Sequence, residues 1–153
     1  MTVTPPPSSN NTKAIMTARL LGYGGLLPFL FLGGAVVLDL HTPFAPASAL
    51  LIGYGAVILS FVGALHWGAQ LNKATEQISA FAFLWSVLPA LLGWVALMMP
   101  VIIATSLLII GLIMCLIYDL RLFKQGDWPI WMRSLRIALT TLACVSLSAN
   151  YLT

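Results

Sequence analysis

"ALLIGYGAVILSFVGALHWGAQL", residues 49–71, is the stretch that decides the fold, because it contains no Asp, Glu, Lys or Arg. At a rise of 1.5 Å per residue, a helix of about 20 apolar residues crosses the hydrocarbon core of a bilayer. The stretch therefore predicts a membrane-spanning helix. It also contains one imidazole, His66, next to Trp67.

The composition of the whole chain indicates the same class of protein. Hydrophobic residues make up 60% of the sequence and charged residues 7%, which cannot cover a water-soluble surface. The 153 residues allow about five or six spans and no sizeable soluble domain. The net charge of +3 does not indicate nucleic-acid binding, because the basic residues flank the apolar segments instead of clustering on one face or arm.

Five apolar segments follow one another, and we predict an all-α integral membrane protein, a compact bundle of five transmembrane helices. Residues 1–17, which include "MTVTPPPSSNNTK", are expected to form a flexible cytoplasmic tail. Residues 18–153 are expected to form a single transmembrane domain. The glycines before Pro28 predict a local kink in its first helix. The predicted helices cover residues 18–38, 49–71, 78–98, 101–120 and 132–152.

The basic residues predict the orientation of this bundle. The 39–48 loop, the turn at Pro100 and the C-terminus contain no Lys or Arg, so all positive charge falls on the other side of a five-span arrangement. The positive-inside rule makes that side cytoplasmic. We expect the N-terminus inside, the C-terminus outside and a multi-pass protein of the plasma membrane. The seven basic residues are Lys13, Arg19, Lys73, Arg121, Lys124, Arg133 and Arg136.

Small residues recur at helical spacing and predict where the helices pack. Lipid gives helices no hydrophobic drive to associate, so close backbone approach at small residues is a main source of attraction. On the 101–120 segment, Gly111 and Cys115 mark the expected buried side. On the 132–152 segment the expected side carries Ser134, Thr141, Cys144 and Ser148. On the 49–71 segment the candidate helix-packing face consists of Gly53, Ala56, Ser60, Gly63, Ala64 and Trp67.

His66 belongs to a candidate buried polar layer near the cytoplasmic end of the bundle. It lies five residues from the end of its predicted helix, roughly 7 Å inside that edge. Such a layer either binds a small polar group or passes a proton, or it only locks helix packing through a neutral hydrogen bond. We favour packing, because we expect no carboxylate beside the ring. The layer consists of Tyr23, His66, Gln70, Cys115 and Tyr118.

Other conspicuous residues point to packing and topology. Asp119 is expected to pair with Arg121, Lys124 or Arg133 at the inner surface. Trp128 and Trp131 are expected to anchor the membrane interface. We expect no cofactor. A haem would need two histidines, but His41 falls on the opposite side of the membrane from His66, and a zinc site lacks enough ligands at one depth. The sequence shows no nucleophile–base set and no phosphate loop, so it predicts no catalytic residue.

Three stretches resemble a known family over nearly the whole chain after the tail. They are "LLGYGGLLPFL" at 20–30, "YGAVILSFVGALHWG" at 54–68 and "WSVLPALLGW" at 85–94. They are similar to the transmembrane protein 69-like family grouped as domain of unknown function 3429. The resemblance implies a bacterial inner-membrane protein with relatives in organelle membranes, and it transfers no catalytic assignment to any residue.

Two classes of function follow from these observations. The leading hypothesis is a non-enzymatic membrane protein, an accessory or assembly component that binds other membrane proteins or itself. The alternative is a small-solute or proton-coupled transporter that uses the polar layer around His66. A membrane enzyme acting on a lipid or quinone ranks third, because such chemistry usually needs more acid–base or metal groups.

Overall fold

The computed structural model of the chain describes residues 9–40, 42–71, 74, 79–126 and 128–152, and all regular structure within them is helical. α1 and α2 follow each other so closely that they form one kinked stretch, so the predicted bundle of five helices is confirmed. Four stretches are long and apolar enough to cross a membrane, and α4 is a shorter apolar helix. The elements are α1 (Ser9–Gly24), α2 (Leu27–Val37), α3 (Ala47–Leu71), α4 (Ala80–Ala96), α5 (Val101–Gln125), α6 (Ile130–Leu147) and the 3-10 turn η2 (Ser148–Tyr151).

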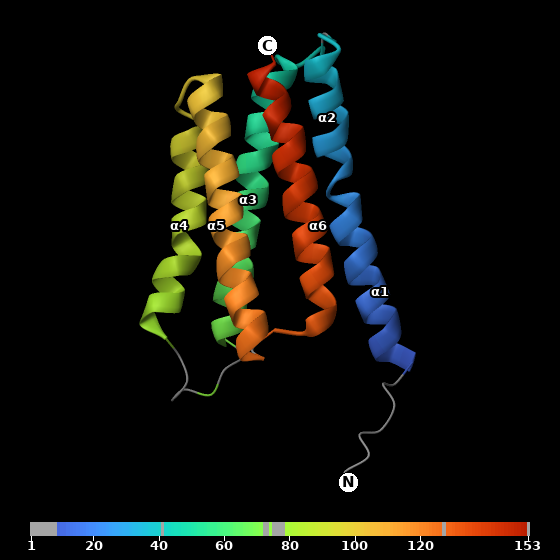
Figure 1. The fold of residues 1–153 in the computed structure, drawn as a ribbon, viewed down its shortest axis with the longest axis vertical. Coiled ribbons are helices and arrows are strands. Elements are labelled where there is room, and N and C mark those ends of the chain that lie inside the picture. Colours follow the sequence, from blue (N-terminus) through green and yellow to red (C-terminus); the bar gives the residue numbers. More distant parts are fainter. Residues whose placement is uncertain (1–8, 41, 72–73, 75–78, 127, 153) are drawn as a thin grey trace.

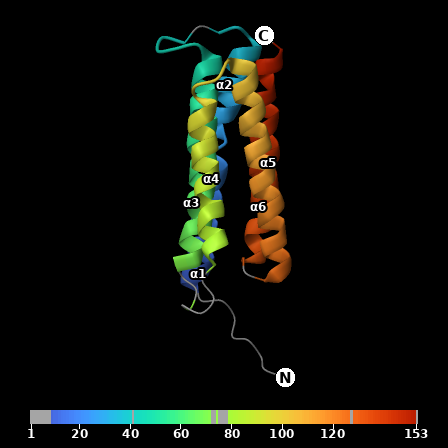
Figure 2. The same cartoon turned by 90° about the vertical axis from the view of Figure 1, so that its left-hand side faces the viewer.

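The helices run side by side between two ends of the bundle, as both views show (Figures 1 and 2). The end of α2, the start of α3, the turn between α4 and α5, and η2 lie at one end. The starts of α1, α4 and α6 lie at the other, which we call the basic end because Lys13, Arg19, Arg121, Lys124 and Arg133 flank it. The first and last helical residues therefore lie at opposite ends.

Two helical stretches extend well beyond their predicted ends. α1 begins at Ser9, so residues 9–17 of the expected tail are helical, since no proline or glycine interrupts the chain between Pro7 and Gly22. Residues 1–8 lie outside the described residues. α5 continues past residue 120 to Gln125 and ends at Gly126, whose φ of 81° is the left-handed conformation that closes many helices.

The predicted kink in the first span is confirmed between Gly24 and Leu27. Gly25 and Leu26 leave the helix there, which frees backbone groups that must find partners in an apolar environment. The hydroxyl of Tyr54 on α3 donates a hydrogen bond of 2.7 Å to the carbonyl oxygen of Gly25. The kink is therefore fixed by a contact with the neighbouring span.

α3 is the central helix and packs against α2, α4, α5 and α6. Its closest approach is to α4, at two glycines. A Cβ on Gly63 would lie 2.4 Å from the carbonyl oxygen of Ser86, and a Cβ on Gly93 would lie 3.0 Å from the carbonyl oxygen of Ala56. A side chain at Gly63 would collide with the backbone of α4, and one at Gly93 would be tighter than most real contacts, as expected for helices that associate closely in lipid.

The predicted packing face of α3 needs correction. Ala56 and Gly63 are buried, but Ala64 and Trp67 are exposed, and a Cβ on Gly53 would meet no described atom within 4 Å. Ser60 is half-buried and bonds back to the carbonyl oxygen of Ala56. The helix is turned by roughly a quarter of a turn from the prediction. Its buried face carries Leu51, Ile52, Gly55, Leu59, Val62, His66 and Gln70.

The predicted face of the last helix also needs correction, because Ser134 and Thr141 are exposed. The buried face of α6 instead contains Arg136, Thr140 and Ala143. Small residues occur on both the covered and the uncovered sides of these helices, so their spacing alone does not identify the buried side.

Candidate functional site

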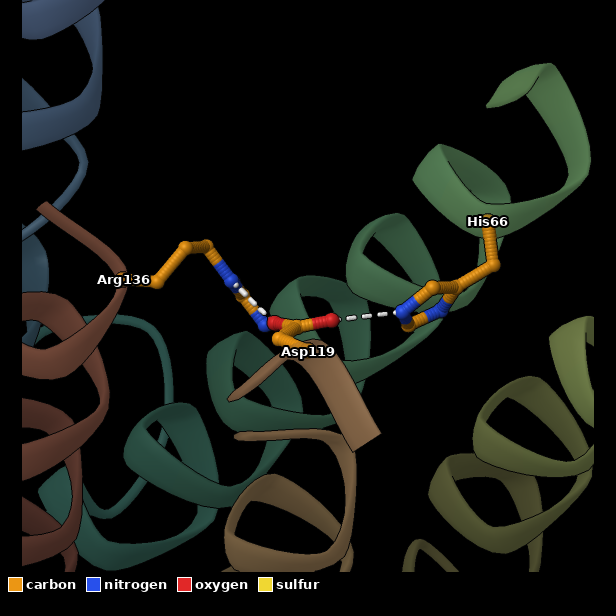
Figure 3. A network of polar contacts seen from close by, with 3 residues as sticks. All are labelled: His66, Asp119 and Arg136. Carbon is orange, nitrogen blue, oxygen red and sulfur yellow. Dashed lines mark hydrogen bonds and ion pairs between the residues drawn. The ribbon is translucent and has the colours of Figure 1, made fainter. Parts of the chain in front are cut away.

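Three ionisable side chains from three helices meet inside the bundle near its basic end (Figure 3). The carboxylate of Asp119 on α5 accepts a hydrogen bond from Nε2 of His66 on α3, and the two atoms are 2.6 Å apart. Its other oxygen accepts a hydrogen bond from Nε of Arg136 on α6, also at 2.6 Å. We call His66, Asp119 and Arg136 the ionic triad.

The ionic triad is almost completely buried. The exposed fractions are 0% for Asp119, 2% for His66 and 5% for Arg136. Burying an unpaired charge is very costly, but Arg136 compensates the charge of Asp119, and hydrogen bonds to ionised groups are the strong ones. The triad therefore connects α3, α5 and α6 where neither water nor lipid reaches the carboxylate.

Helical spacing explains why these side chains point inward. Asp119 lies four residues after Cys115 and eight after Gly111, so the three share the buried side of α5. Arg136 precedes Thr140 by four residues on the buried side of α6, and His66 follows Val62 by four on that of α3. Each ionisable side chain is thus placed toward one end of an otherwise apolar or weakly polar stripe.

Aromatic rings cover the imidazole of His66. The ring of Tyr118 lies edge-on to it at 5.2 Å, and the ring of Trp128 is tilted against it at 5.5 Å. Trp128 is 8% exposed, so it is a packing residue of the site and not the interfacial anchor that we predicted. Trp131 is half-buried, and the guanidinium of Arg19 lies 6.0 Å from the centre of its ring.

The predicted polar layer is only partly assembled. Cys115 is buried one turn from Asp119, and Tyr118 contacts His66. Gln70 is buried and accepts a hydrogen bond of 3.2 Å from the backbone N–H of Ser79. Tyr23 is 48% exposed and does not belong to the layer, because its side of α1 faces away from the bundle.

A carboxylate, that of Asp119, lies beside His66, where the sequence predicts none. Asp119 pairs with Arg136 instead of Arg121, Lys124 or Arg133. The spacing of Gly111, Cys115 and Asp119 was a signal that could have found it, because it extends the predicted buried side of the 101–120 segment by one turn. Arg136 lies near a span end like the other basic residues that indicate the orientation, so its position in the sequence did not predict an interior role.

Two polar atoms of the triad have no hydrogen-bond partner among the described residues. They are Nδ1 of His66 and Nη2 of Arg136. The same part of the chain contains no group of three or more His, Cys, Asp or Glu that could hold a metal ion. Chemically, the site joins three helices by hydrogen bonds, and one imidazole nitrogen and one guanidinium nitrogen have no partner among the described residues.

A second buried polar pair lies toward the opposite end of the bundle. Nδ2 of Asn150 donates a hydrogen bond of 2.9 Å to Oγ1 of Thr105. Between this pair and the ionic triad lie Leu59, Leu108 and Leu112, which are at most 2% exposed. The two polar sites are therefore separated by a layer of leucine side chains.

Comparisons with known proteins identify relatives of the chain. A family model described as "Protein of unknown function (DUF3429)" matches residues 14–152. Transmembrane protein 69 of Xenopus tropicalis is 35% identical over 134 residues, which cover 85% of this chain and 51% of the frog protein. Transmembrane protein 69 of Mus musculus is 27% identical over 150 residues, covering 92% of this chain and 60% of the mouse protein. No solved structure matches the chain.

Proposed function

The chain belongs to the DUF3429 family and is similar to transmembrane protein 69, and from this premise we propose that it is a non-enzymatic accessory or assembly component that binds other membrane proteins. The names of the relatives state a membrane location and no activity. The chain spans about half the length of the frog relative, with 51% of that protein covered. The proposal therefore rests on the surface and the interior of this chain.

The observation that carries the proposal is the uncovered side of α3. Gly53, Ala64 and Gly68 share this side, and a Cβ on either glycine would meet no described atom within 4 Å. Glycine in a helix costs about 1 kcal/mol relative to alanine, and contact with lipid does not require it. Small residues on an outer face do, however, let the backbone of a partner helix approach closely.

The contacts within the ionic triad favour a role in binding a partner protein over an enzymatic role. Both oxygens of Asp119 are engaged within the triad, and the rings of Tyr118 and Trp128 pack on His66. These contacts hold the helices that position α3. Because α3 is already ordered, a partner that binds its outer face pays no entropic cost of ordering that helix.

A small-solute or proton-coupled transporter is the second candidate, and one observation favours it. Asp119 and His66 form an ionisable pair inside the bundle, and such pairs often mark proton or ion pathways. Against it stands the layer of Leu59, Leu108 and Leu112, because between Arg136 and Asn150 the buried polar residues of α6 are only Thr140 and Ser146, whose hydroxyls do not ionise near neutral pH. The binding role therefore ranks first.

For the location we propose the bacterial inner membrane, with the basic end in the cytoplasm. The support is the positive-inside rule, since Lys13, Arg19, Arg121, Lys124 and Arg133 flank the same end of the helices. In this orientation α1 begins inside and η2 ends outside.

Purification in mild detergent tests the binding role. We expect the wild-type protein to co-purify with a membrane protein at a fixed stoichiometry, and Ala64→Leu to lose it while keeping its abundance and melting temperature. Val145→Leu is the matched control, because Val145 is 64% exposed on α6, away from the α3 face. A wild-type protein without a stoichiometric partner, or an Ala64→Leu variant that retains it, would contradict the proposal.

A further inference from the structure

The two halves of the first span differ in how firmly they pack. α2 contacts α3, α6 and η2, and its buried residues are Phe29, Gly33, Ala35 and Val36. α1 contacts mainly α6, and none of its residues from Thr12 to Gly24 is buried. A segment with few buried contacts is the part of a fold that moves most easily. α1 is therefore held to the bundle more weakly than α2.

The chain between these two halves lacks the hydrogen bonds of a continuous helix. Pro28 has no N–H, so the carbonyl oxygen of Gly24 cannot accept the bond that a continuous helix would give it. The N–H of Leu26 donates to a carbonyl three residues earlier instead of four. The carbonyl oxygen of Gly25 accepts a hydrogen bond from the hydroxyl of Tyr54, which holds this point beside α3. Such a joint at the end of a helix can absorb the backbone change of a hinge.

A cavity of about 370 Å³ lies beside α1, on the side that faces α3 and α6. Its walls are almost entirely apolar. α1 contributes Ala18, Leu21 and Gly22 to them, and α3 contributes Phe61 and Leu65. α1 and α6 diverge toward the basic end (Figure 1). The cavity is therefore the space that α1 would fill if it moved toward α3.

The side of α1 that borders the cavity suits a closer approach than the structure shows. Ala18 and Gly22 lie one turn apart on this side, and helices in lipid attract each other where small residues let their backbones meet. The atoms nearest to a Cβ on Gly22 belong to the side chain of Leu135, at 3.2 Å. A Cβ on Gly63 would instead meet a neighbouring backbone. α1 has thus not made the backbone contact that its small residues permit.

We propose that α1 is a hinged arm that pivots at Gly24–Leu26 between two positions. The open position is that of this structure. In the closed position Ala18 and Gly22 pack against α3, the cavity is filled, and Phe61, which is 58% exposed in the open position, becomes covered. The arm thereby opens and closes the side of the bundle between α3 and α6. It is separate from the outer face of α3 and does not depend on a protein partner.

Distances between spin labels in lipid nanodiscs, measured by pulsed electron paramagnetic resonance, test the arm. The labels are placed on introduced cysteines in a Cys115→Ala, Cys144→Ala background. One pair joins Met16 on α1 to Leu84 on α4, and the reference pair joins Leu30 on α2 to Leu84, all at exposed positions. We expect two distances for the Met16 pair, the shorter from the closed position, and one for the Leu30 pair. A single distance of the same width for both pairs would overturn the proposal.

Pro28→Ala tests the joint. The alanine supplies the N–H that the carbonyl oxygen of Gly24 lacks, so α1 and α2 should become one continuous helix. We expect the Met16 pair to shift to a single distance in this variant. Leu27→Ala is the matched control, because it changes an exposed residue of the same turn and adds no N–H. Two distances that persist in Pro28→Ala would show that the joint is not the pivot.

Disulfide trapping tests the closed position with the native cysteines in place, which keeps the proposal testable if the cysteine-free background does not accumulate. Leu21→Cys and Leu65→Cys lie on opposite walls of the cavity, so they should form a disulfide under oxidation when α1 closes. Leu20→Cys with Leu65→Cys is the control and should form little, because Leu20 is 63% exposed and does not line the cavity. Equal cross-linking of the two pairs, or none in either, would overturn the closed position.

Discussion

Asp119 pairs with Arg136 on another helix, with Oδ2 and Nε 2.6 Å apart, although Arg121 follows Asp119 by only two residues. Residues two apart on a helix point to nearly opposite sides, so Arg121 is exposed while Asp119 is buried. The pairing therefore connects α5 to α6 instead of bridging neighbours on one helix. Arg136 therefore counts among the basic residues that indicate the orientation in the membrane, and it also pairs with Asp119 inside the bundle.

Arg136→Met should destabilise the protein severely. It leaves the carboxylate of Asp119 buried without its positive partner, and breaking a buried pair in this way costs about 3–5 kcal/mol. The measurement is the free energy of unfolding in mild detergent with increasing denaturing detergent. Arg133→Met is the matched control, since Arg133 is exposed three residues earlier on the same helix. Equal stability of the two variants would show that the triad does not hold the bundle together.

Removing the carboxylate as well should reverse most of that loss. Asp119→Leu combined with Arg136→Met replaces two buried charges by apolar side chains of similar volume, and such replacements are often neutral. We expect the double variant to be more stable than Arg136→Met alone in the same unfolding measurement. A double variant as unstable as the sum of the two single variants would mean that these residues act independently.

The spans and the buried side of α5 could be predicted from the sequence, whereas the buried faces of α3 and α6 could not. Hydropathy identifies the spans because hydrocarbon tolerates few charges over about 20 residues. It does not distinguish a helix surface covered by lipid from one covered by protein, since both are apolar. Gly63 and Gly53 look alike in sequence, yet only Gly63 meets a neighbouring backbone.

The triad was missed for a related reason. Charges near the ends of spans are normally read as topology signals, and Arg136 fits that pattern as well as Arg133 does. The two arginines differ in the side of the helix on which they lie, because Arg136 shares the buried side of α6 with Thr140 and Ala143. His66 was identified as a polar interior residue, but the identity of its partner required the three-dimensional arrangement.

Gly63→Ala should destabilise the contact between α3 and α4. The added Cβ would lie 2.4 Å from the carbonyl oxygen of Ser86, which is backbone and cannot move away like a flexible side chain. We expect a loss of about 1–3 kcal/mol, typical of overpacking. Gly68→Ala on the same helix is the control, because a Cβ there meets no described atom within 4 Å. The melting temperatures of the two variants in detergent should therefore differ, and similar values would mean that the close contact does not limit stability.

Reporter fusions test the proposed orientation. A periplasm-active reporter placed after Thr153 or within residues 39–48 should be active, because both sites lie at the end without Lys or Arg. The same reporter placed at the N-terminus should be inactive. A cytoplasmic signal from either external site would contradict the five-span orientation.

His66→Gln distinguishes the two proposed functions. Glutamine can still donate a hydrogen bond to Asp119, whereas His66→Leu leaves one oxygen of the carboxylate without its partner. If the imidazole only packs, His66→Gln should retain membrane abundance, melting temperature and rescue of a deletion strain, and His66→Leu should lose them. Glutamine cannot take up or release a proton, whereas an imidazole can. A transporter that depends on this proton would give a His66→Gln protein of normal abundance and stability that fails to rescue. That result would move the transporter to first place, because the loss would then follow from the missing proton exchange and not from the fold.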